Sequence, residues 1–131
     1  MEEDYCLLGI VSDEPDYKLC WLLNQALHTD FTREEDLVLF SKKLGEDQEI
    51  SLFTHEDEQR MTTYRVIVNR ANTGHYLSEL KQIDFFLHIQ GEIDTEHIGQ
   101  LISTIGRISP VRMCVPVNLS LIKDRQRLQL W

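Results

Sequence analysis

Five histidines have the widest chemical range in this sequence, because imidazole can transfer protons near neutral pH or bind a metal ion. They are His28, His55, His75, His88 and His97. In the stretch THED, His55 stands two residues before Asp57. A single H-x-D pair lacks the further ligands that a metal ion needs, so we predict no metal site. We expect ordinary sheet histidines, with His55 and His88 close together if both lie on the same face.

The three cysteines, Cys6, Cys20 and Cys114, are scattered and form no C-x-x-C pair, which indicates buried free thiols. Nucleophilic catalysis requires a base beside the nucleophile, and no basic residue neighbours Cys20 on the apolar side of its predicted helix. The glycine-rich phosphate-binding patterns and the G-x-S-x-G pattern do not occur. We therefore predict no catalytic residue and no cofactor. We expect a non-enzymatic protein rather than an enzyme.

A first candidate partner surface lies on the polar side of the helix predicted between Asp16 and Leu27. Tyr17, Trp21 and Asn24 follow one another at about one-turn spacing, opposite the apolar stripe. Large aromatic side chains are favoured anchors at protein interfaces, so we group these three residues with Asp16 as a candidate binding surface. The alternative is that a loop or the C-terminal tail covers the aromatic rings.

A second candidate is the stretch LSELKQIDF, residues 77–85, which places Glu79, Lys81 and Asp84 before and at the start of an apolar strand. Our structural interpretation is that Glu79 and Asp84 accept backbone N–H bonds and hold the start of the strand, with Lys81 or Arg70 pairing with one of them. The functional interpretation joins Glu79, Lys81 and Asp84 to the helix residues in one recognition surface.

The elements that must carry these residues follow from the apolar pattern. Strands are predicted over residues 4–12, 36–40, 50–55, 63–69, 83–90 and 108–118, and helices over residues 16–27 and from 94 or 95 onward. Pro15 suits the first helical position, and Asp94 or Thr95 suits the second helix cap. The stretch KKLGEDQE, residues 42–49, is predicted to be a polar turn.

This order predicts one α+β domain over residues 1–131, with a mostly antiparallel sheet and two helices on one face. Strand–helix–strand units at both ends bracket an extra central hairpin, which suggests a ferredoxin-like βαβ…βαβ order. The second sheet face is unusually apolar for a solvated surface. Either the C-terminal tail, residues 118–131, covers it, or a second copy packs on it in a two-fold homodimer.

The strands are apolar on both parities, so the assignment of residues to faces is itself a prediction. To the face covered by the helices we assign Leu7, Val66, Phe85, Leu87, Met113 and Val115. To the opposite face we assign Leu8, Ile10, Phe53, Ile67, Phe86 and Cys114.

The formal net charge of −9 disfavours direct binding to nucleic acid, since that affinity depends on Lys and Arg neutralising phosphates. The short basic stretch KDRQR, residues 123–127, is interpreted as a solvated tail. No apolar run approaches the roughly 20 residues of a membrane helix, and the acidic start MEEDY is unlike a secretory signal. We expect a cytoplasmic protein.

Residues 77–85 resemble the motif of the IPExxxVDY family of small, uncharacterised bacterial proteins. Glu79 and Asp84 match the motif identically, whereas Leu77, Ile83 and Phe85 are close substitutes and Ser78 replaces the proline. The segment PDYKLCWLLNQAL, residues 15–27, is similar to the family's first helix. The resemblance implies no activity, substrate or cofactor.

We therefore expect a cytoplasmic, non-enzymatic protein-binding or adaptor domain with an unknown protein partner. The alternative is a small-ligand sensor or an enzyme, with its pocket between the sheet and the helices or at a dimer interface. A deep cleft lined by polar groups would favour the alternative.

Overall fold

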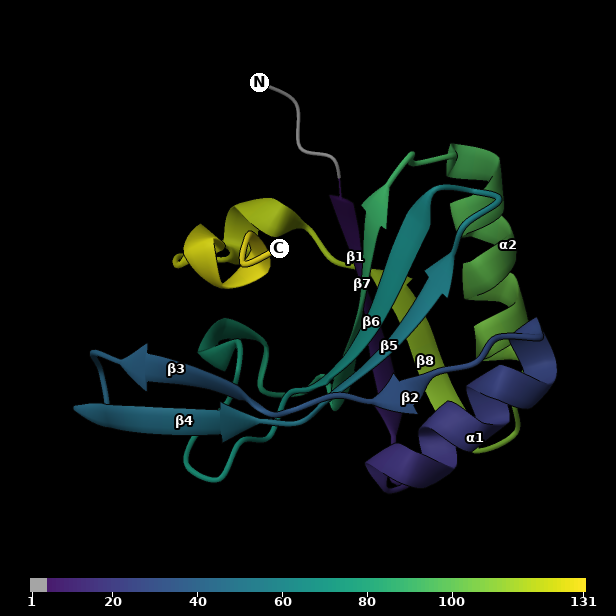
Figure 1. Cartoon of the computed structure of the whole chain (residues 1–131). Coiled ribbons are helices and arrows are strands. Elements are labelled where there is room, and N and C mark those ends of the chain that lie inside the picture. The colour runs from purple at the N-terminus through teal and green to yellow at the C-terminus, as the bar shows by residue number, and fades with distance from the viewer. Residues whose placement is uncertain (1–4) are drawn as a thin grey trace.

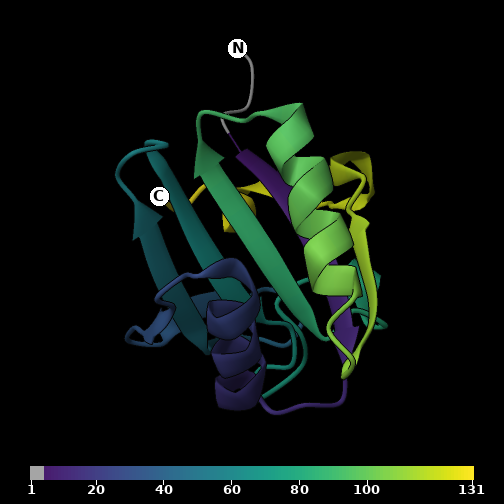
Figure 2. The same ribbon diagram turned by 90° about the vertical axis from the view of Figure 1, so that its right-hand side faces the viewer.

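The structure is a computed structural model that describes residues 5–131. It has three layers, and the large sheet is the middle one. Two helices form the first layer and a six-stranded sheet forms the second. A β-hairpin, a long loop and the C-terminal segment lie on the other side of the sheet (Figure 1). Figure 2 shows both helices in front of the sheet. The predicted α+β class, with a mostly antiparallel sheet and two helices on one face, is confirmed.

The elements and their bounds are as follows. The strands are β1 (Tyr5–Ser12), β2 (Thr32–Arg33), β3 (Leu37–Ser41), β4 (Glu46–Ile50), β5 (Leu52–Asp57), β6 (Thr62–Val68), β7 (Phe85–Gly91) and β8 (Val111–Pro116). The α-helices are α1 (Asp16–Leu27) and α2 (Thr95–Gly106). Three short 3₁₀-helices, η1 (Ser78–Leu80), η2 (Leu119–Leu121) and η3 (Arg125–Leu128), lie in the long loop and the C-terminal segment.

The large sheet has the strand order β2-β5-β6-β7-β1-β8, and all of its pairings are antiparallel. Strands β1 and β7 are both interior strands of this sheet, which agrees with their apolar residues on both parities. Strands β3 and β4 form a separate two-stranded sheet. The ferredoxin-like assignment stays a prediction.

The two helices begin close to the predicted residues. Pro15 is the N-cap of α1 rather than its first helical residue, and α1 ends where His28 takes the left-handed conformation at φ 56°. Asp94 caps α2, and its side chain accepts a hydrogen bond from the Glu96 N–H at 3.0 Å. Such a cap satisfies one of the backbone donors that a helix start leaves unpaired. No helix within residues 5–131 is long and apolar enough to cross a membrane.

The turn predicted over residues 42–49 is only half correct. Glu46–Ile50 is strand β4, and it pairs with β3 from Ser41↔Glu46 to Leu37↔Ile50. Gln48 and Ile50 are buried whereas Asp47 and Glu49 are exposed, so this strand has a period of two that its polar composition concealed. The turn that connects the strands contains Gly45 at φ +70°.

The face assignment was wrong for β1 and for parts of β5 and β8. Directly paired residues of antiparallel strands point to the same face, and Leu8 pairs with Leu87 whereas Leu7 pairs with His88. The helix-covered face therefore carries Leu8, Ile10, Phe53 and Cys114 with Val66, Phe85 and Leu87. Leu7 lies on the opposite face with Ile67 and Phe86. Met113 is exposed and Val115 is half-buried.

The same register separates the two histidines that we expected on one face. His55 pairs with Tyr64, which belongs to the apolar cluster beneath the helices, whereas His88 contacts the C-terminal residue Trp131 on the other side. A one-residue change of register reverses every side chain of a strand, and the apolar pattern alone cannot detect it when both faces are buried.

The second face of the sheet is closed by three segments of the chain itself. The C-terminal segment supplies Ile122 and Leu128, the hairpin supplies Ile50, and the loop between β6 and β7 supplies Tyr76, Leu77, Leu80 and Ile83. These side chains form one apolar cluster with Leu7, Ile67 and Phe86 of the sheet. Because this face is filled, a homodimer through it would have to displace these segments.

Candidate functional site

The outer surface of α1 carries two uncovered aromatic rings. Tyr17 and Trp21 are 69% and 54% exposed, and the Lys18 ammonium lies 4.8 Å from the centre of the Trp21 ring. Asp16 lies 3.9 Å from the Arg33 guanidinium. No described segment covers these rings, contrary to the alternative that a loop or the tail does so.

Asn24 takes no part in that surface, because its side chain organises the loop after α1. Its Oδ1 accepts hydrogen bonds from the Phe31 N–H at 2.8 Å and from the Thr29 hydroxyl at 2.9 Å. Its Nδ2 donates to the Phe31 carbonyl at 3.4 Å. We therefore assign Asn24 a structural role in directing the chain toward β2.

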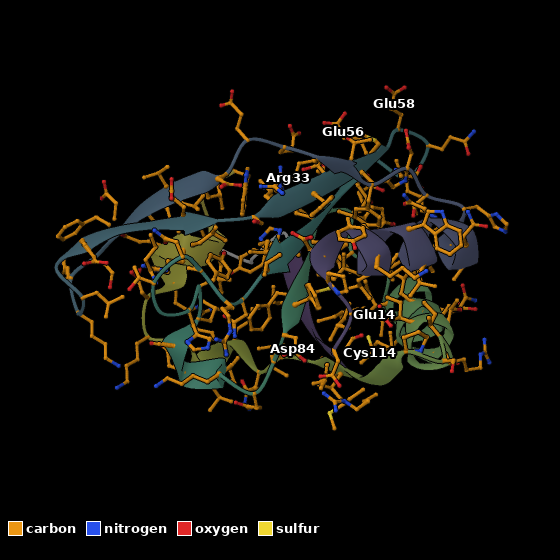
Figure 3. The ribbon with its side chains drawn as sticks, turned by 90° about the horizontal axis from the view of Figure 1, so that it is seen from below. Glu14, Arg33, Glu56, Glu58, Asp84 and Cys114 are labelled. Atoms are coloured by element: carbon orange, nitrogen blue, oxygen red, sulfur yellow. The ribbon has the colours of Figure 1, made fainter. Side chains whose placement is uncertain are left out.

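Asp84 holds the end of strand β1. Its Oδ2 accepts a hydrogen bond from the Ser12 N–H at 2.9 Å, where the register between β1 and β8 shifts. The Ser12 hydroxyl then donates to the Pro110 carbonyl and accepts from the Glu14 N–H. Figure 3 labels Asp84 and Glu14 at this end of the molecule. A carboxylate that receives an otherwise unpaired N–H has the form that our structural interpretation requires.

Glu79 holds the C-terminal segment in the same way. Its Oε2 accepts a hydrogen bond from the Lys123 N–H at 2.7 Å. Backbone N–H groups distant in the sequence are thus the partners of both carboxylates, as our structural interpretation expected. Among the described residues, no ion pair joins Lys81 or Arg70 to either carboxylate. The seven candidate residues do not form one surface, since α1 packs on one face of the sheet and the loop of Glu79 packs on the other.

The loop that carries the LSELKQIDF stretch is fixed by Asn69, which is fully buried. Its Nδ2 donates to the carbonyls of Leu80 and Ile83 at 2.9 and 2.8 Å, and its Oδ1 accepts from the Leu77 N–H at 2.9 Å. One amide side chain therefore satisfies three backbone groups of a loop that has no ladder partner. We did not predict this role of Asn69, because a single Asn at the end of a strand carries no distinctive pattern.

A groove of about 1120 Å³ lies between the β3–β4 turn, the loop after β6 and the C-terminal segment. Its lining includes Lys42, Lys43 and Leu44 of the turn, His75 to Glu79 and Lys81 of the loop, and Ile122 to Asp124, Gln126 and Arg127 of the C-terminal segment. Phe40 lies at its rim and is exposed. Of the candidate residues, this groove contains Glu79 and Lys81.

The groove is basic although the protein is acidic. Four of the five lysines of the sequence, together with Arg127, line it, against two carboxylates, Glu79 and Asp124. These charges give the lining a formal charge of +3, whereas the whole chain carries −9. Figure 3 shows Glu56 in β5 and Glu58 just after it, well away from the β3–β4 turn. Such a separation of charge creates a local positive potential.

A buried polar network holds the three walls of the groove together. Gln48 of β4 donates through Nε2 to the carbonyls of Thr73 and His75, at 2.7 and 3.1 Å. Its Oε1 accepts from Arg127 Nη2 at 2.7 Å, and Arg127 Nη1 donates to the Tyr76 carbonyl at 2.9 Å. The Tyr76 hydroxyl donates to the Arg127 carbonyl. Burial raises the pKa of Tyr76 well above its usual value, so this hydroxyl remains a donor.

The described residues show no constellation for covalent or metal chemistry. Burial raises the pKa of the Cys6 and Cys114 thiols to about 11 and that of Cys20 to about 12, so all three stay protonated at neutral pH. Within residues 5–131 no group of three His, Cys, Asp or Glu side chains is placed to hold a metal ion. The positive charge of the groove lining instead suits a ligand that carries negative charge.

Three comparisons with known proteins give no match. No family model matches the chain, and neither does any curated protein or any solved structure. The resemblance to the IPExxxVDY family stays a prediction.

The groove could not be predicted from the sequence, because its lysines are distant from one another along the chain. Lys42 and Lys43 lie in a turn, Lys81 in a loop, and Lys123 in the stretch that we interpreted as a solvated tail. That interpretation was wrong for Arg127, whose guanidinium joins the buried network. An available signal was the near absence of lysine elsewhere, since Lys18 is the fifth.

Proposed function

We propose that this chain is a protein-binding domain that holds a short acidic segment of its partner in the basic groove. The observation that carries the proposal is the concentration of four of the five lysines around one groove in a chain of net charge −9. Complementary charge steers a partner toward a surface and selects its orientation there. We propose the cytoplasm as its location, because three free thiols suit a reducing compartment.

An extended peptide suits the size and composition of the groove. A volume of about 1120 Å³ lies slightly above the roughly 300–1000 Å³ of small-molecule pockets. At its rim the exposed side chains of Phe40 and Leu44 offer apolar contacts beside the ammonium groups. The partner segment would therefore combine Asp or Glu residues with at least one large apolar side chain, which anchors it in a desolvated contact.

A short segment is favoured over a nucleic acid by the charge of the rest of the molecule. At physiological ionic strength charges are screened over about 8 Å, so a segment of a few residues interacts mainly with the groove lysines. A longer polyanion would extend over surfaces that carry the excess of Asp and Glu. The fixed Gln48–Tyr76–Arg127 network keeps the groove in shape before binding, which reduces the entropy lost on association.

The test is fluorescence anisotropy with a labelled peptide of roughly ten residues, about 33 Å when extended, in which Asp and Glu alternate with two leucines. The double variant Lys42→Glu/Lys81→Glu should weaken binding by roughly tenfold or more, because each substitution replaces an attraction with a repulsion. Raising the salt concentration should weaken binding to the unchanged protein as well.

The matched control is Lys18→Glu on α1, outside the groove, and it is compared with the single groove variant Lys81→Glu, which makes the same charge change. Lys18→Glu should alter the dissociation constant by no more than about twofold. Equal weakening by Lys18→Glu and by Lys81→Glu would show that net charge alone drives binding and would refute the proposal. Tighter binding of a single-stranded oligonucleotide than of the peptide would refute the protein-partner assignment.

A further inference from the structure

A second, smaller cavity lies on the other side of the sheet, beneath the helices. It has a volume of about 330 Å³ and opens between the C-terminal end of α1, α2 and the paired strands β5 and β6. The sheet separates it from the basic groove, because its buried lining residues belong to the cluster under the helices. Its size is at the lower end of the range of small-molecule pockets.

One side of the cavity is apolar. Leu27, Phe31, Leu87 and Leu101 line it, and all but Leu27 are buried. This part of the cavity offers no hydrogen bond from a side chain, so it suits the hydrocarbon surface of a ligand.

The opposite side presents polar groups that are already held in place. The Tyr64 hydroxyl lies 2.8 Å from His97 Nε2, which joins strand β6 to α2. His55 Nδ1 accepts a hydrogen bond from the Asp30 N–H at 3.1 Å, so its remaining proton is on Nε2, which is a donor. The rings of Phe31, His55 and Tyr64 form a continuous aromatic group, with centres 5.7 and 5.8 Å apart.

The charges of the lining compensate each other. Asp57 and Arg60 are its carboxylate and its guanidinium, and their Oδ2 and Nε atoms lie 4.0 Å apart. Burial lowers the pKa of His97, with Arg60 acting in the same direction, and burial raises the pKa of Tyr64. Both groups are therefore uncharged at neutral pH and can act as hydrogen-bond donor and acceptor without carrying a formal charge.

We propose that this cavity binds a small, uncharged, planar molecule: an aromatic or heteroaromatic ring with one hydrogen-bonding substituent. The ring lies against the apolar side and the aromatic group, since flat rings pack best in offset or edge-to-face contact. The substituent meets Tyr64, His55 and His97. An anionic or cationic ligand is disfavoured, because the lining supplies no unpaired charge to replace the lost hydration. This site is independent of the groove and of the proposed peptide.

The experiment uses three fragments with the same ring and different charge: benzamide, benzoate and benzylamine. Each is titrated into the full chain at pH 7.5 while the imidazole signals of His55 and His97 are followed by NMR. Benzamide should shift both signals and bind at least about threefold more tightly than either charged fragment. If no fragment perturbs these signals up to its solubility limit, or if a charged fragment binds as tightly as benzamide, the proposal is wrong.

Two matched tyrosine variants test the position of the site. Tyr64→Phe keeps the ring but removes the hydroxyl, and it should weaken benzamide binding by about five- to tenfold. Tyr17→Phe removes the same group from the exposed surface of α1 and should change the affinity by less than about twofold. Thermal unfolding is measured for both variants to check that they are folded. Should Tyr64→Phe unfold, His55→Phe replaces it, and unchanged benzamide affinity in the folded variant overturns the proposal.

Discussion

Lowering the pH from 7.5 to 5 should loosen the C-terminal segment through His88. This side chain is 1% exposed and lies between Tyr5, stacked at 5.0 Å, and Trp131 at 4.9 Å. Its Nε2 lies 2.8 Å from the Leu128 carbonyl, which can only accept, so Nε2 carries the proton. Its buried Nδ1 has no hydrogen-bond partner among the described residues. Protonation would therefore place an unpaired charge beneath the tail.

The magnitude follows from the pKa of His88, which burial lowers from 6.5 to about 4, with Arg65 acting in the same direction and the Leu128 hydrogen bond opposing both. Because the unfolded chain binds this proton at a higher pH than the folded chain does, stability is lost as the pH falls from 6.5 toward 4. The full difference corresponds to about 3.4 kcal/mol. Between pH 7.5 and pH 5 the loss should be about 2 kcal/mol.

The assay is urea unfolding across this pH range, followed by circular dichroism and by the fluorescence of Trp131 in a Trp21→Phe background. The matched variant is His88→Gln, whose amide can donate to the Leu128 carbonyl but does not titrate. Other titrating groups are common to both proteins, so the difference between their pH slopes isolates His88. Equal losses in the two proteins, or an NMR titration of His88 with a pKa near 6.5, would refute the reasoning.

Three further predictions concern stability and are measured by urea unfolding at pH 7.5. Asn69→Ala should lower the free energy of unfolding by about 2–4 kcal/mol, because it leaves the buried Leu77 N–H and Ile83 carbonyl unpaired and removes one of the two bonds to the Leu80 carbonyl; a loss below about 1 kcal/mol would contradict that role. Asp84→Asn should cost about 1–2 kcal/mol and Glu79→Gln less, because the Glu79 contact is exposed; unchanged stability in both variants would contradict our structural interpretation. Gly91→Ala should cost about 3 kcal/mol or more, because a Cβ there would lie 2.2 Å from the Met61 carbonyl oxygen at φ +124°. Its control, Gly99→Ala, has free space in α2 and should stabilise the protein by about 0.5–1 kcal/mol.

The secondary structure was largely predictable because it depends on local pattern. The period-two alternation of residues 83–90 and the helical spacing of Ile98, Leu101, Ile102 and Ile105 survive in β7 and α2. The failure at β4 has the opposite cause, since Gln48 and Ile50 are buried by tertiary contacts within a segment whose composition is polar.

Which residues meet in space was not predictable, because register and loop paths depend on contacts between distant segments. The faces of β1 followed from the pairing of Leu8 with Leu87, which no property of the YCLLGIVS stretch could reveal. The groove required residues 42, 81 and 123 to converge, and the cavity required His55 and His97 to lie around Tyr64.

The sequence by itself determined the α+β class, two helices, an interior strand at β1 that is apolar on both faces, and an excess of apolar strand surface that the C-terminal tail or a second copy of the protein had to cover. Those features follow from side-chain periodicity and from the free energy of removing apolar surface from water, which act over short stretches of chain. Only the tertiary structure decided that the chain covers its own second face and that this arrangement gathers the lysines of an acidic protein around one groove. Which charged groups and hydrogen-bonding groups become neighbours depends on contacts between segments that are distant along the chain. The loops that bring those segments together have no local pattern in the sequence that predicts their path.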